Sequence, residues 1–161
     1  MDKAGGGPPR FLCDEMLGRL ARYLRAAGYD TGLAAAGTTD RELLRTAVAE
    51  GRHFLTCDRQ ILEHRVAPGV ACLLVPGPLD ALAAAVAERF AIDWLHAPFT
   101  RCLVDNTPLQ DALHSAHPEL PADLVGRTIR RCPACGRVYW FGSHCRRMRQ
   151  HLERWQAARC P

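Results

Sequence analysis

The chain has 161 residues, 48% of them hydrophobic and 24% charged, which is the balance of a soluble globular protein and excludes a largely disordered chain. No run approaches the roughly 18 consecutive apolar residues of a membrane span, and the N-terminus lacks the apolar core of a signal peptide. The net charge of +4 is unevenly spread, because residues 1–126 carry −4 whereas residues 127–161 carry +8. We therefore expect a cytoplasmic protein without a membrane partner, whose basic C-terminal region suits a polyanion such as RNA.

Alternating strands and helices are predicted over the first 90 residues, after a Gly- and Pro-rich stretch, residues 1–10, that we expect to be disordered. Short apolar runs predict strands at 10–14, 29–34, 53–57 and 69–75. Apolar residues at helical spacing predict helices at 16–28, 38–51, 58–65 and 79–90. Gly28 and Gly51 are the expected stop signals of the first two helices. The expected buried faces of these two helices are Leu17, Leu20, Leu24 and Ala27, and Leu43, Leu44, Ala47 and Val48. This alternation indicates an α/β fold with a mainly parallel sheet covered on both faces.

Three aspartates, Asp14, Asp40 and Asp58, stand where a predicted strand or turn passes into a helix. In an open α/β sheet such junctions collect along the edge formed by the carboxyl ends of the strands. Gathered carboxylates repel one another unless a cation lies between them, and Mg²⁺ and Mn²⁺ prefer carboxylate oxygens. The pattern therefore indicates a metal site. Aspartate is also a favoured N-cap, and Thr39 with Glu42 fits a capping box, so helix capping is the competing interpretation.

Four segments resemble the Mut-7 C-terminal RNase domain family: FLCDEMLGRLARYLRAAGYDT, TDRELLRTA, GRHFLTCDRQIL, and RCPACGRVYWFGSH followed by RM. The resemblance runs from Phe11 to about Trp155. It implies a PIN-like nuclease domain at residues 11–97, followed by a small zinc-ribbon module with a basic C-terminal helix at residues 98–161. It also implies that the three aspartates are catalytic metal ligands of a magnesium- or manganese-dependent ribonuclease. Glu15, Glu42 and Asp80 are candidates for a fourth carboxylate.

The implied reaction is hydrolysis of an RNA phosphodiester by metal-activated water, which requires no side-chain nucleophile. Thr56 is a candidate to hydrogen-bond a ligand carboxylate or the scissile phosphate, or else it is a β-branched strand residue. Arginines recur along the first helix at Arg19, Arg22 and Arg25, where they face the RNA backbone or form an ordinary solvated helix face. The competing function is a non-catalytic zinc-ribbon RNA-binding protein with an inactive PIN-like domain.

Cysteine spacing predicts a second metal site. Cys132 and Cys135 form a CxxC turn followed by Gly136, a strong signal for zinc. Structural zinc takes four ligands, and Cys102 is the expected third. The family pattern leads us to expect another cysteine three residues after Cys102, but Asp105 stands there. The fourth ligand is then Asp105 or Cys145, with His144 as a further option, or the metal has been lost.

The remaining conspicuous side chains have two interpretations each. Tyr139 and Trp140 can stack on the bases of single-stranded RNA, or they form the core of the small module. His144 has a role near RNA or in the ribbon, or caps the C-terminal helix. The remaining four cysteines are expected to be three buried thiols and a free one near the terminus: Cys13, Cys57, Cys72 and Cys160. Between the two predicted parts we expect a Pro-containing connector with one short helix.

Overall fold

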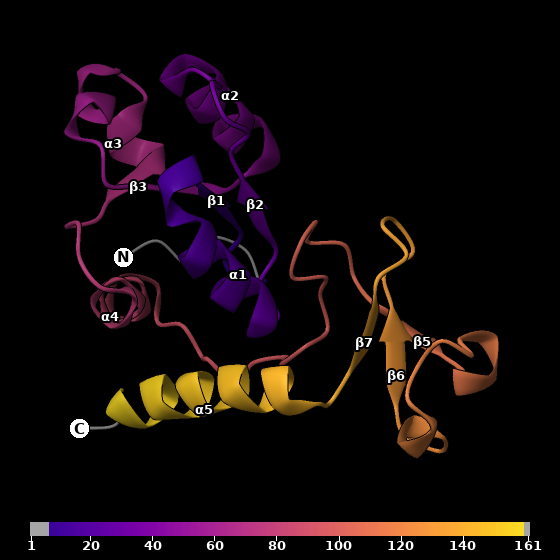
Figure 1. The fold of residues 1–161 in the computed structure, drawn as a ribbon. Helices are drawn as coiled ribbons and strands as arrows, with labels where there is room; N and C mark the ends of the chain where they lie inside the picture. The colour runs from indigo at the N-terminus through magenta and orange to yellow at the C-terminus, as the bar shows by residue number, and fades with distance from the viewer. Residues whose placement is uncertain (1–6, 160–161) are drawn as a thin grey trace.

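The first part of the chain alternates strands and helices, as Figure 1 shows for this computed structural model, which describes residues 7–159. Its strands are β1 (Phe11–Cys13), β2 (Thr31–Leu33), β3 (His53–Thr56) and β4 (Ala71–Leu73). Its helices are α1 (Gly18–Ala26), α2 (Asp40–Glu50), α3 (Ala67–Val70) and α4 (Leu79–Phe90), with 3₁₀ turns η1 (Glu15–Leu17) and η2 (Arg59–Glu63). The four strands are parallel in the order β2-β1-β3-β4.

Apolar side chains cover both faces of this sheet, which confirms the predicted three layers. Alternate residues of β1 point to opposite faces, so that Phe11 and Cys13 enter one core and Leu12 enters the other. The larger core contains α1, α4 and the C-terminal helix α5 (Ser143–Ala158), and the smaller one contains α2 and α3. The predicted buried face of α1 is correct, whereas Val48, assigned to the buried face of α2, is 54% exposed.

One predicted helix and the following strand are shorter than expected. Residues 58–65 were predicted as one helix, but they form η2, and a separate short helix, α3, follows at Ala67–Val70. Pro68 lies in the first turn of α3, where the missing N–H and the fixed φ of proline suit a helix start. The fourth strand therefore begins only at Ala71 rather than at Gly69.

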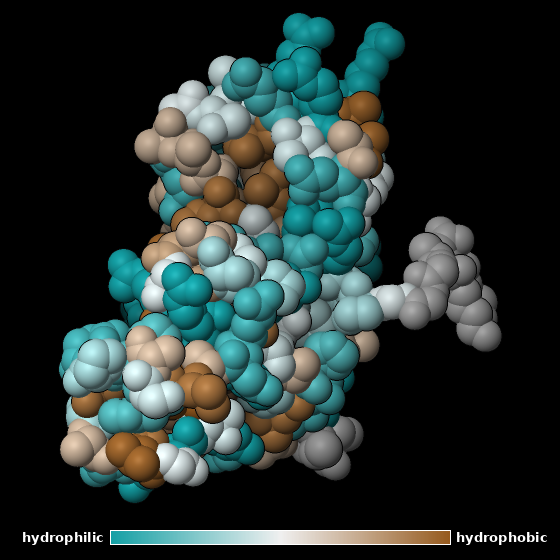
Figure 2. Space-filling model, turned by 90° about the vertical axis from the view of Figure 1, so that its right-hand side faces the viewer, coloured by the Kyte–Doolittle hydropathy of each residue, from teal (hydrophilic) through white to brown (hydrophobic). Residues whose placement is uncertain are grey.

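The second part of the chain contains a small antiparallel sheet of β5 (Gln110–Ala112), β6 (Ile129–Arg131) and β7 (Val138–Trp140). In place of the predicted connector with one short helix, residues 98–128 contain β5 and two 3₁₀ turns, η3 (His114–Ala116) and η4 (Ala122–Leu124). Viewed from the side of this sheet, the surface is mostly polar, with apolar side chains reaching it in separate patches (Figure 2).

The C-terminal helix α5 returns from the small sheet to the first part (Figure 1). Trp155 of α5 packs against Trp94 and Tyr23, with ring centroids 4.9 Å away in each case. Its Nε1 donates to Asp80 Oδ1 in α4 at 2.8 Å. The larger core therefore continues across residue 97, although the division into residues 11–97 and 98–161 remains a proposal.

A close backbone contact fixes the segment that leads out of the first part. Gly28 follows α1 with a φ of +98°, and a Cβ there would lie 2.4 Å from the Ala97 carbonyl oxygen. Only glycine fits this position. The predicted stop at Gly51 is confirmed, since this residue caps α2 in the left-handed conformation.

Two predictions concern residues at the ends. Residues 1–6 of the stretch predicted to be disordered, and the free thiol of Cys160, lie outside the described residues. The side chain of Arg10, the last residue of that stretch, contacts Asp30 and the Glu50 carbonyl oxygen. Within residues 7–159, no helix is long and apolar enough to cross a bilayer.

Candidate active site and metal centre

Two of the predicted aspartates follow neighbouring strands. Asp14 comes directly after β1 and Asp58 comes two residues after β3, and these strands pair in parallel. Thr56, at the end of β3, joins the two: its Oγ1 donates to Asp14 Oδ2 at 2.8 Å and accepts from the Asp58 N–H at 3.0 Å. Thr56 is buried, whereas Asp14 and Asp58 are more exposed, so both bonds are partly buried. Thr56 is thus a strand residue and also a hydrogen-bond partner of a candidate ligand.

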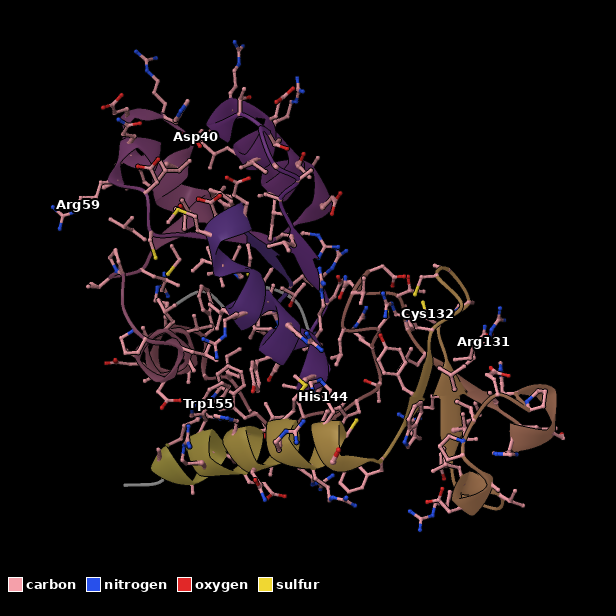
Figure 3. The ribbon with its side chains drawn as sticks, in the orientation of Figure 1. Asp40, Arg59, Arg131, Cys132, His144 and Trp155 are labelled. Carbon is pink, nitrogen blue, oxygen red and sulfur yellow. The ribbon has the colours of Figure 1, made fainter. Side chains whose placement is uncertain are left out.

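The third aspartate faces the same opening from α2. Asp14, Asp40 and Asp58 all line one open hollow of about 610 Å³ at the carboxyl edge of the sheet, which we call the acidic hollow. Figure 3 shows Asp40 between α2 and α3, at the end of the molecule away from α5. Its carboxylate Oδ2 lies 4.0 Å from His64 Nε2. The alternation of strands and helices therefore does bring these three side chains to one edge.

Two of the aspartates, Asp14 and Asp58, also cap the 3₁₀ turns that follow them. Asp14 Oδ1 accepts from the Glu15 N–H at 2.7 Å, and Asp58 Oδ1 accepts from the Gln60 N–H at 2.9 Å. The predicted capping box of Thr39 and Glu42 is present, with Asp40 in the first turn of α2. Among residues 7–159, the three carboxylates do not come within 4.8 Å of one another as a group. Capping and a common hollow are both observed, so the two interpretations are compatible.

Of the three candidates for a fourth carboxylate, Glu15 alone lines the acidic hollow. The carboxylate of Glu42 is used by the capping box, where Oε2 accepts from the Thr39 N–H at 3.0 Å. Asp80 lies at the junction of α4 and α5 and accepts from Trp155 and Arg154. These two side chains have structural roles away from the hollow.

The pKa values of two thiols near the hollow are raised. Burial raises the pKa of Cys13 to about 12, against the lowering effect of Arg25 and with a further rise from Asp14. Burial and the Asp14 carboxylate also raise the pKa of the half-buried Cys57 thiol. A neutral thiol is a weak nucleophile. The carboxylate oxygens at this edge are the donors that suit Mg²⁺ or Mn²⁺.

The second group of candidate ligands converges tightly. Cys102, Asp105, Cys132 and Cys135 each offer one ligand atom, and these atoms all lie within 4.8 Å of one another; we call them the Cys/Asp cluster. The Sγ atoms of Cys102 and Cys135 are 3.7 Å apart, and Cys132 Sγ lies 3.3 Å from Asp105 Oδ2. Three thiols and a carboxylate at such distances can hold a metal ion such as zinc. Asp105 occupies the place of the missing cysteine, and Cys145 does not belong to the group.

Local hydrogen bonds prepare Asp105 to act as an anion. Burial by itself would raise its pKa, but hydrogen bonds from the Thr107 N–H and from the thiols of Cys135 and Cys102 hold the pKa of Asp105 well below its usual value. At Cys135 a backbone hydrogen bond from Arg137 lowers the pKa, but burial, Asp105 and the other two thiols outweigh it and raise the pKa to about 12. The negative charges of several thiolates and of Asp105 would repel one another. A bound cation would offset this repulsion, because it stabilises every thiolate at once.

A buried arginine fastens the Cys/Asp cluster to the first part of the chain. The Nη1 atom of Arg25 donates to the carbonyl oxygens of Leu103 and Val104 at 3.1 and 2.9 Å, and Nε donates to Thr31 O at 2.8 Å. The prediction that Arg25 faces RNA or solvent is wrong, because the residue is only 5% exposed. The sequence signal for its burial was its position one helical turn after Ala21, a small apolar residue that the structure buries.

The other singled-out side chains surround the cluster or the start of α5. The Tyr139 hydroxyl lies 3.1 Å from Cys102 Sγ and accepts from the Leu103 N–H, so its tip is committed to the cluster. His144 lies at the start of α5 with Nε2 2.9 Å from Arg22 Nη2 (Figure 3). Cys145 is buried in α5. The acidic hollow and Cys132 lie well apart in Figure 3.

A family profile described as the Mut7-C RNase domain matches residues 9–152. The chain belongs to the Mut7-C RNase domain family. It is also 37% identical over 101 residues to the exonuclease mut-7 homolog of Homo sapiens, a match covering 60% of this chain and 12% of that protein. The chain thus corresponds to a small part of that relative's length. No solved structure matches the chain. Membership of the Mut7-C family supports a nuclease-like function for this chain.

Proposed function

We propose that this Mut7-C chain is a magnesium- or manganese-dependent ribonuclease that hydrolyses phosphodiester bonds at the acidic hollow. The observation that carries the proposal is the convergence of Asp14, Asp40 and Asp58 on one open hollow at the carboxyl edge of a parallel sheet. Ligand sites of open α/β sheets form at this edge. A set of carboxylates there favours hard divalent cations over zinc.

The residues of the hollow are suited to holding such an ion. Asp14 and Asp58 each use Oδ1 to accept a backbone N–H, a bond that fixes the carboxylate plane. Asp14 Oδ2 is further oriented by Thr56. Asp40 and Glu15 also line the hollow. When bound, a divalent cation supplies Lewis-acid activation of a water and stabilises the charge on the phosphoryl oxygens.

The Cys/Asp cluster is proposed to hold structural zinc, with Cys102, Asp105, Cys132 and Cys135 as ligands. Four ligands fill a tetrahedral zinc site and leave no position open for substrate. The ion would join the 102–107 loop to the turn between β6 and β7. Because Arg25 binds this loop, the zinc would also fix the small sheet and the basic helix α5 relative to α1.

Single-stranded RNA is the proposed substrate and partner. The region after residue 126 holds nine arginines and one acid, a charge balance that favours phosphate contacts. We propose that the small sheet and α5 bind the RNA while the acidic hollow cleaves it. The PIN-like character of residues 11–97 and a cytoplasmic location belong to the same proposal.

The test is cleavage of labelled single-stranded RNA by metal-stripped protein, with and without manganese, beside the Asp14→Asn and Asp58→Asn variants. We expect manganese-dependent cleavage that falls by at least about a hundredfold in both variants, because each loses a charged ligand. The matched control is Glu88→Gln, an exposed carboxylate on α4 that does not line the acidic hollow. Cleavage that survives in both variants contradicts the assignment.

A second function is favoured by one observation, that Asp14 and Asp58 cap the 3₁₀ turns η1 and η2 and Glu42 completes the capping box of α2. If these carboxylates served as caps alone, the chain would be a non-catalytic zinc-ribbon RNA-binding protein. The same assay separates the two: RNA binding without cleavage under every metal condition would establish the non-catalytic function, with the aspartates as caps.

A further inference from the structure

A second hollow lies between the small sheet and the start of α5. Its volume is about 190 Å³, room for one flat ring and too small for a duplex. Its lining residues are mostly aromatic, aliphatic or arginine, and none of those that the structure describes is acidic. The side chains that matter here are Phe99, Trp140, Phe141, Arg101, Arg130 and Arg149, and we call this site the aromatic hollow. The absence of a carboxylate among them favours an anionic ligand.

The backbone holds Phe99 in an unusual conformation at this hollow. Its φ is +57°, in the left-handed region that residues with a Cβ rarely adopt. The Phe99 N–H donates to Ala26 O at 2.8 Å, and the Phe99 carbonyl oxygen accepts from Arg130 Nη1 at 2.9 Å. Such strain persists where the surroundings fix it and is concentrated at binding sites. Here it directs an aromatic ring against Phe141, edge to face, with ring centroids 6.4 Å apart.

Two further aromatic rings are available at the hollow. Phe141 is 48% exposed, a large fraction for a side chain of its size. Trp140 is half-buried and lies so close to Gly142 that a Cβ there would be 2.9 Å from Trp140 Nε1. By contrast, Trp94 and Trp155 are buried in the larger core. Trp140 is therefore the tryptophan whose ring a ligand can reach.

Arginine completes the site. The Arg149 guanidinium lies 5.9 Å from the centre of the Phe141 ring, and its Nε binds Glu153. Of the contacts that the described residues make, this leaves the two Nη atoms of Arg149 for a phosphate. Arg101 is already held in place by carbonyl oxygens. Arg130 is held by the Phe99 carbonyl oxygen and by Asp111, whose Oδ1 lies 3.5 Å from Arg130 Nε. Little freedom is therefore lost when the two arginines bind an anion.

We propose that the aromatic hollow binds one unpaired base of single-stranded RNA, stacked on Phe141 and Trp140. Aromatic rings accept the face of any base, and only a single strand presents that face. The adjoining phosphates lie against Arg149, Arg130 and Arg101. This inference rests on the proposed function for the choice of RNA as substrate. It adds an RNA-binding site distinct from the acidic hollow.

Tryptophan fluorescence tests the stacking directly. Protein carrying Asp58→Asn, so that RNA stays intact, is titrated with oligouridylate of 20 nucleotides. We expect emission to be quenched, because a base stacks on Trp140, and we expect the added Trp140→Phe change to remove the quenching. Inorganic polyphosphate, which has charge and no base, should leave the emission unchanged. Quenching that is absent, or equally strong with polyphosphate, overturns the proposal.

Fluorescence anisotropy with labelled RNA tests the contribution to affinity. Phe141→Ala should raise the Kd for the single strand about tenfold, the usual effect of removing one stacking ring. Phe141→Tyr should restore binding because it keeps the ring. Leu113→Ala, which changes an exposed apolar residue between β5 and η3 and outside the hollow, is the matched control. Duplex RNA should bind Phe141→Ala and the parent protein equally, since its bases are paired.

The outcomes separate this inference from the proposed function. Equal Kd values for Phe141→Ala and Leu113→Ala overturn the aromatic hollow as an RNA site, whatever the cleavage assay gives. A tenfold loss that Phe141→Tyr restores supports it, even where Asp58→Asn fails to reduce cleavage. If the hollow instead takes an apolar segment of a protein, Phe141→Ala leaves RNA binding unchanged, which is again the overturning result.

Discussion

The acidic hollow and the Cys/Asp cluster are both groups of candidate metal ligands, but they differ in how far the protein alone has arranged them. The ligand atoms of the Cys/Asp cluster lie within 4.8 Å of one another, and neighbouring N–H groups and thiols hold Asp105 as an anion. The three aspartates face an open hollow of about 610 Å³ and remain further apart. The ligands of the Cys/Asp cluster are thus close enough to share one ion, whereas the aspartates line an open hollow.

This difference corresponds to different tasks. A structural ion needs a full set of protein ligands and no access for water or substrate. An ion that acts on a phosphodiester needs open coordination positions for water and phosphate oxygens. The ligand types agree with this division, because soft thiolates select zinc whereas carboxylates suit magnesium or manganese. We therefore propose the Cys/Asp cluster as the stabilising site and the acidic hollow as the reactive one.

The largest expected effect is on stability, from Cys132→Ala. This change removes a buried ligand of the Cys/Asp cluster, and structural zinc contributes roughly 10 kcal/mol or more of apparent binding free energy in small modules. We expect zinc to be lost and the free energy of unfolding to fall by more than about 3 kcal/mol. Metal analysis and thermal unfolding measure both.

The control for that change is Cys72→Ala, which removes a half-buried thiol outside the cluster. It should keep the zinc. Asp105→Cys should also keep it, because a fourth thiolate replaces the carboxylate. Equal zinc content in Cys132→Ala and the parent protein would contradict this assignment, because the Cys/Asp cluster would then not be the zinc site.

An intermediate effect is expected on cleavage, from Thr56→Val at the acidic hollow. The change keeps the shape of the side chain and removes the hydroxyl that orients Asp14 and accepts from the Asp58 N–H. Loss of such a partner of a metal ligand typically lowers activity about 10- to 100-fold. Rates of RNA cleavage under saturating manganese measure it.

Thr56→Ser keeps the hydroxyl and should retain most of the activity. The zinc content should be the same in the two variants, because Thr56 does not touch the Cys/Asp cluster. A Thr56→Val protein as active as Thr56→Ser would show that the hydroxyl has no part in the reaction.

The smallest expected effect is a loss of stability from Asp30→Asn, a residue outside both the acidic hollow and the Cys/Asp cluster. Asp30 accepts from Arg52, from Arg10 and from Asn106, which belongs to the loop that carries Cys102 and Asp105. Burial opposes ionisation of Asp30, but these donors outweigh burial and hold its pKa well below the usual value. Because Asp30 is partly exposed, solvent screening limits the loss of stability to about 1 kcal/mol.

The pH dependence of this difference has a definite sign. A lowered folded-state pKa gives stability that is present above the unfolded pKa of about 3.9 and is lost as the pH falls toward the folded value. The parent protein should therefore exceed Asp30→Asn in unfolding free energy by a constant amount above about pH 5. Denaturant titrations below pH 4 should show the two converging. A gap that widens in acid would contradict this assignment of the Asp30 pKa.

Much of the fold was readable because local patterns and burial agree. The alternation of apolar runs predicted the parallel sheet, and Thr39, Glu42 and Gly51 marked the two ends of α2. The carboxyl edge followed from topology alone, so the common location of the three aspartates was predictable. The spacing of Cys132 and Cys135 likewise indicated one half of the Cys/Asp cluster.

The failures involve contacts between residues far apart in the chain. Arg25 repeats with Arg19 and Arg22 as if on a solvated face, but the carbonyl oxygens of Leu103 and Val104 bury it. The choice between Asp105 and Cys145 depended on the direction in which α5 leaves β7, which periodicity does not contain. The aromatic hollow likewise depends on the left-handed turn at Phe99, a position where sequence favours no such conformation.

Because α5 returns to the larger core, this core is completed only after most of the chain has been synthesised. The ribosome releases β1 to α4 first, and the side chains that cover Trp94 and Tyr23 arrive only with Trp155, after the small sheet has emerged. Until then the nascent chain exposes an apolar face that α5 will cover. Long-range closure of this kind slows folding and leaves that face open to chaperones during synthesis.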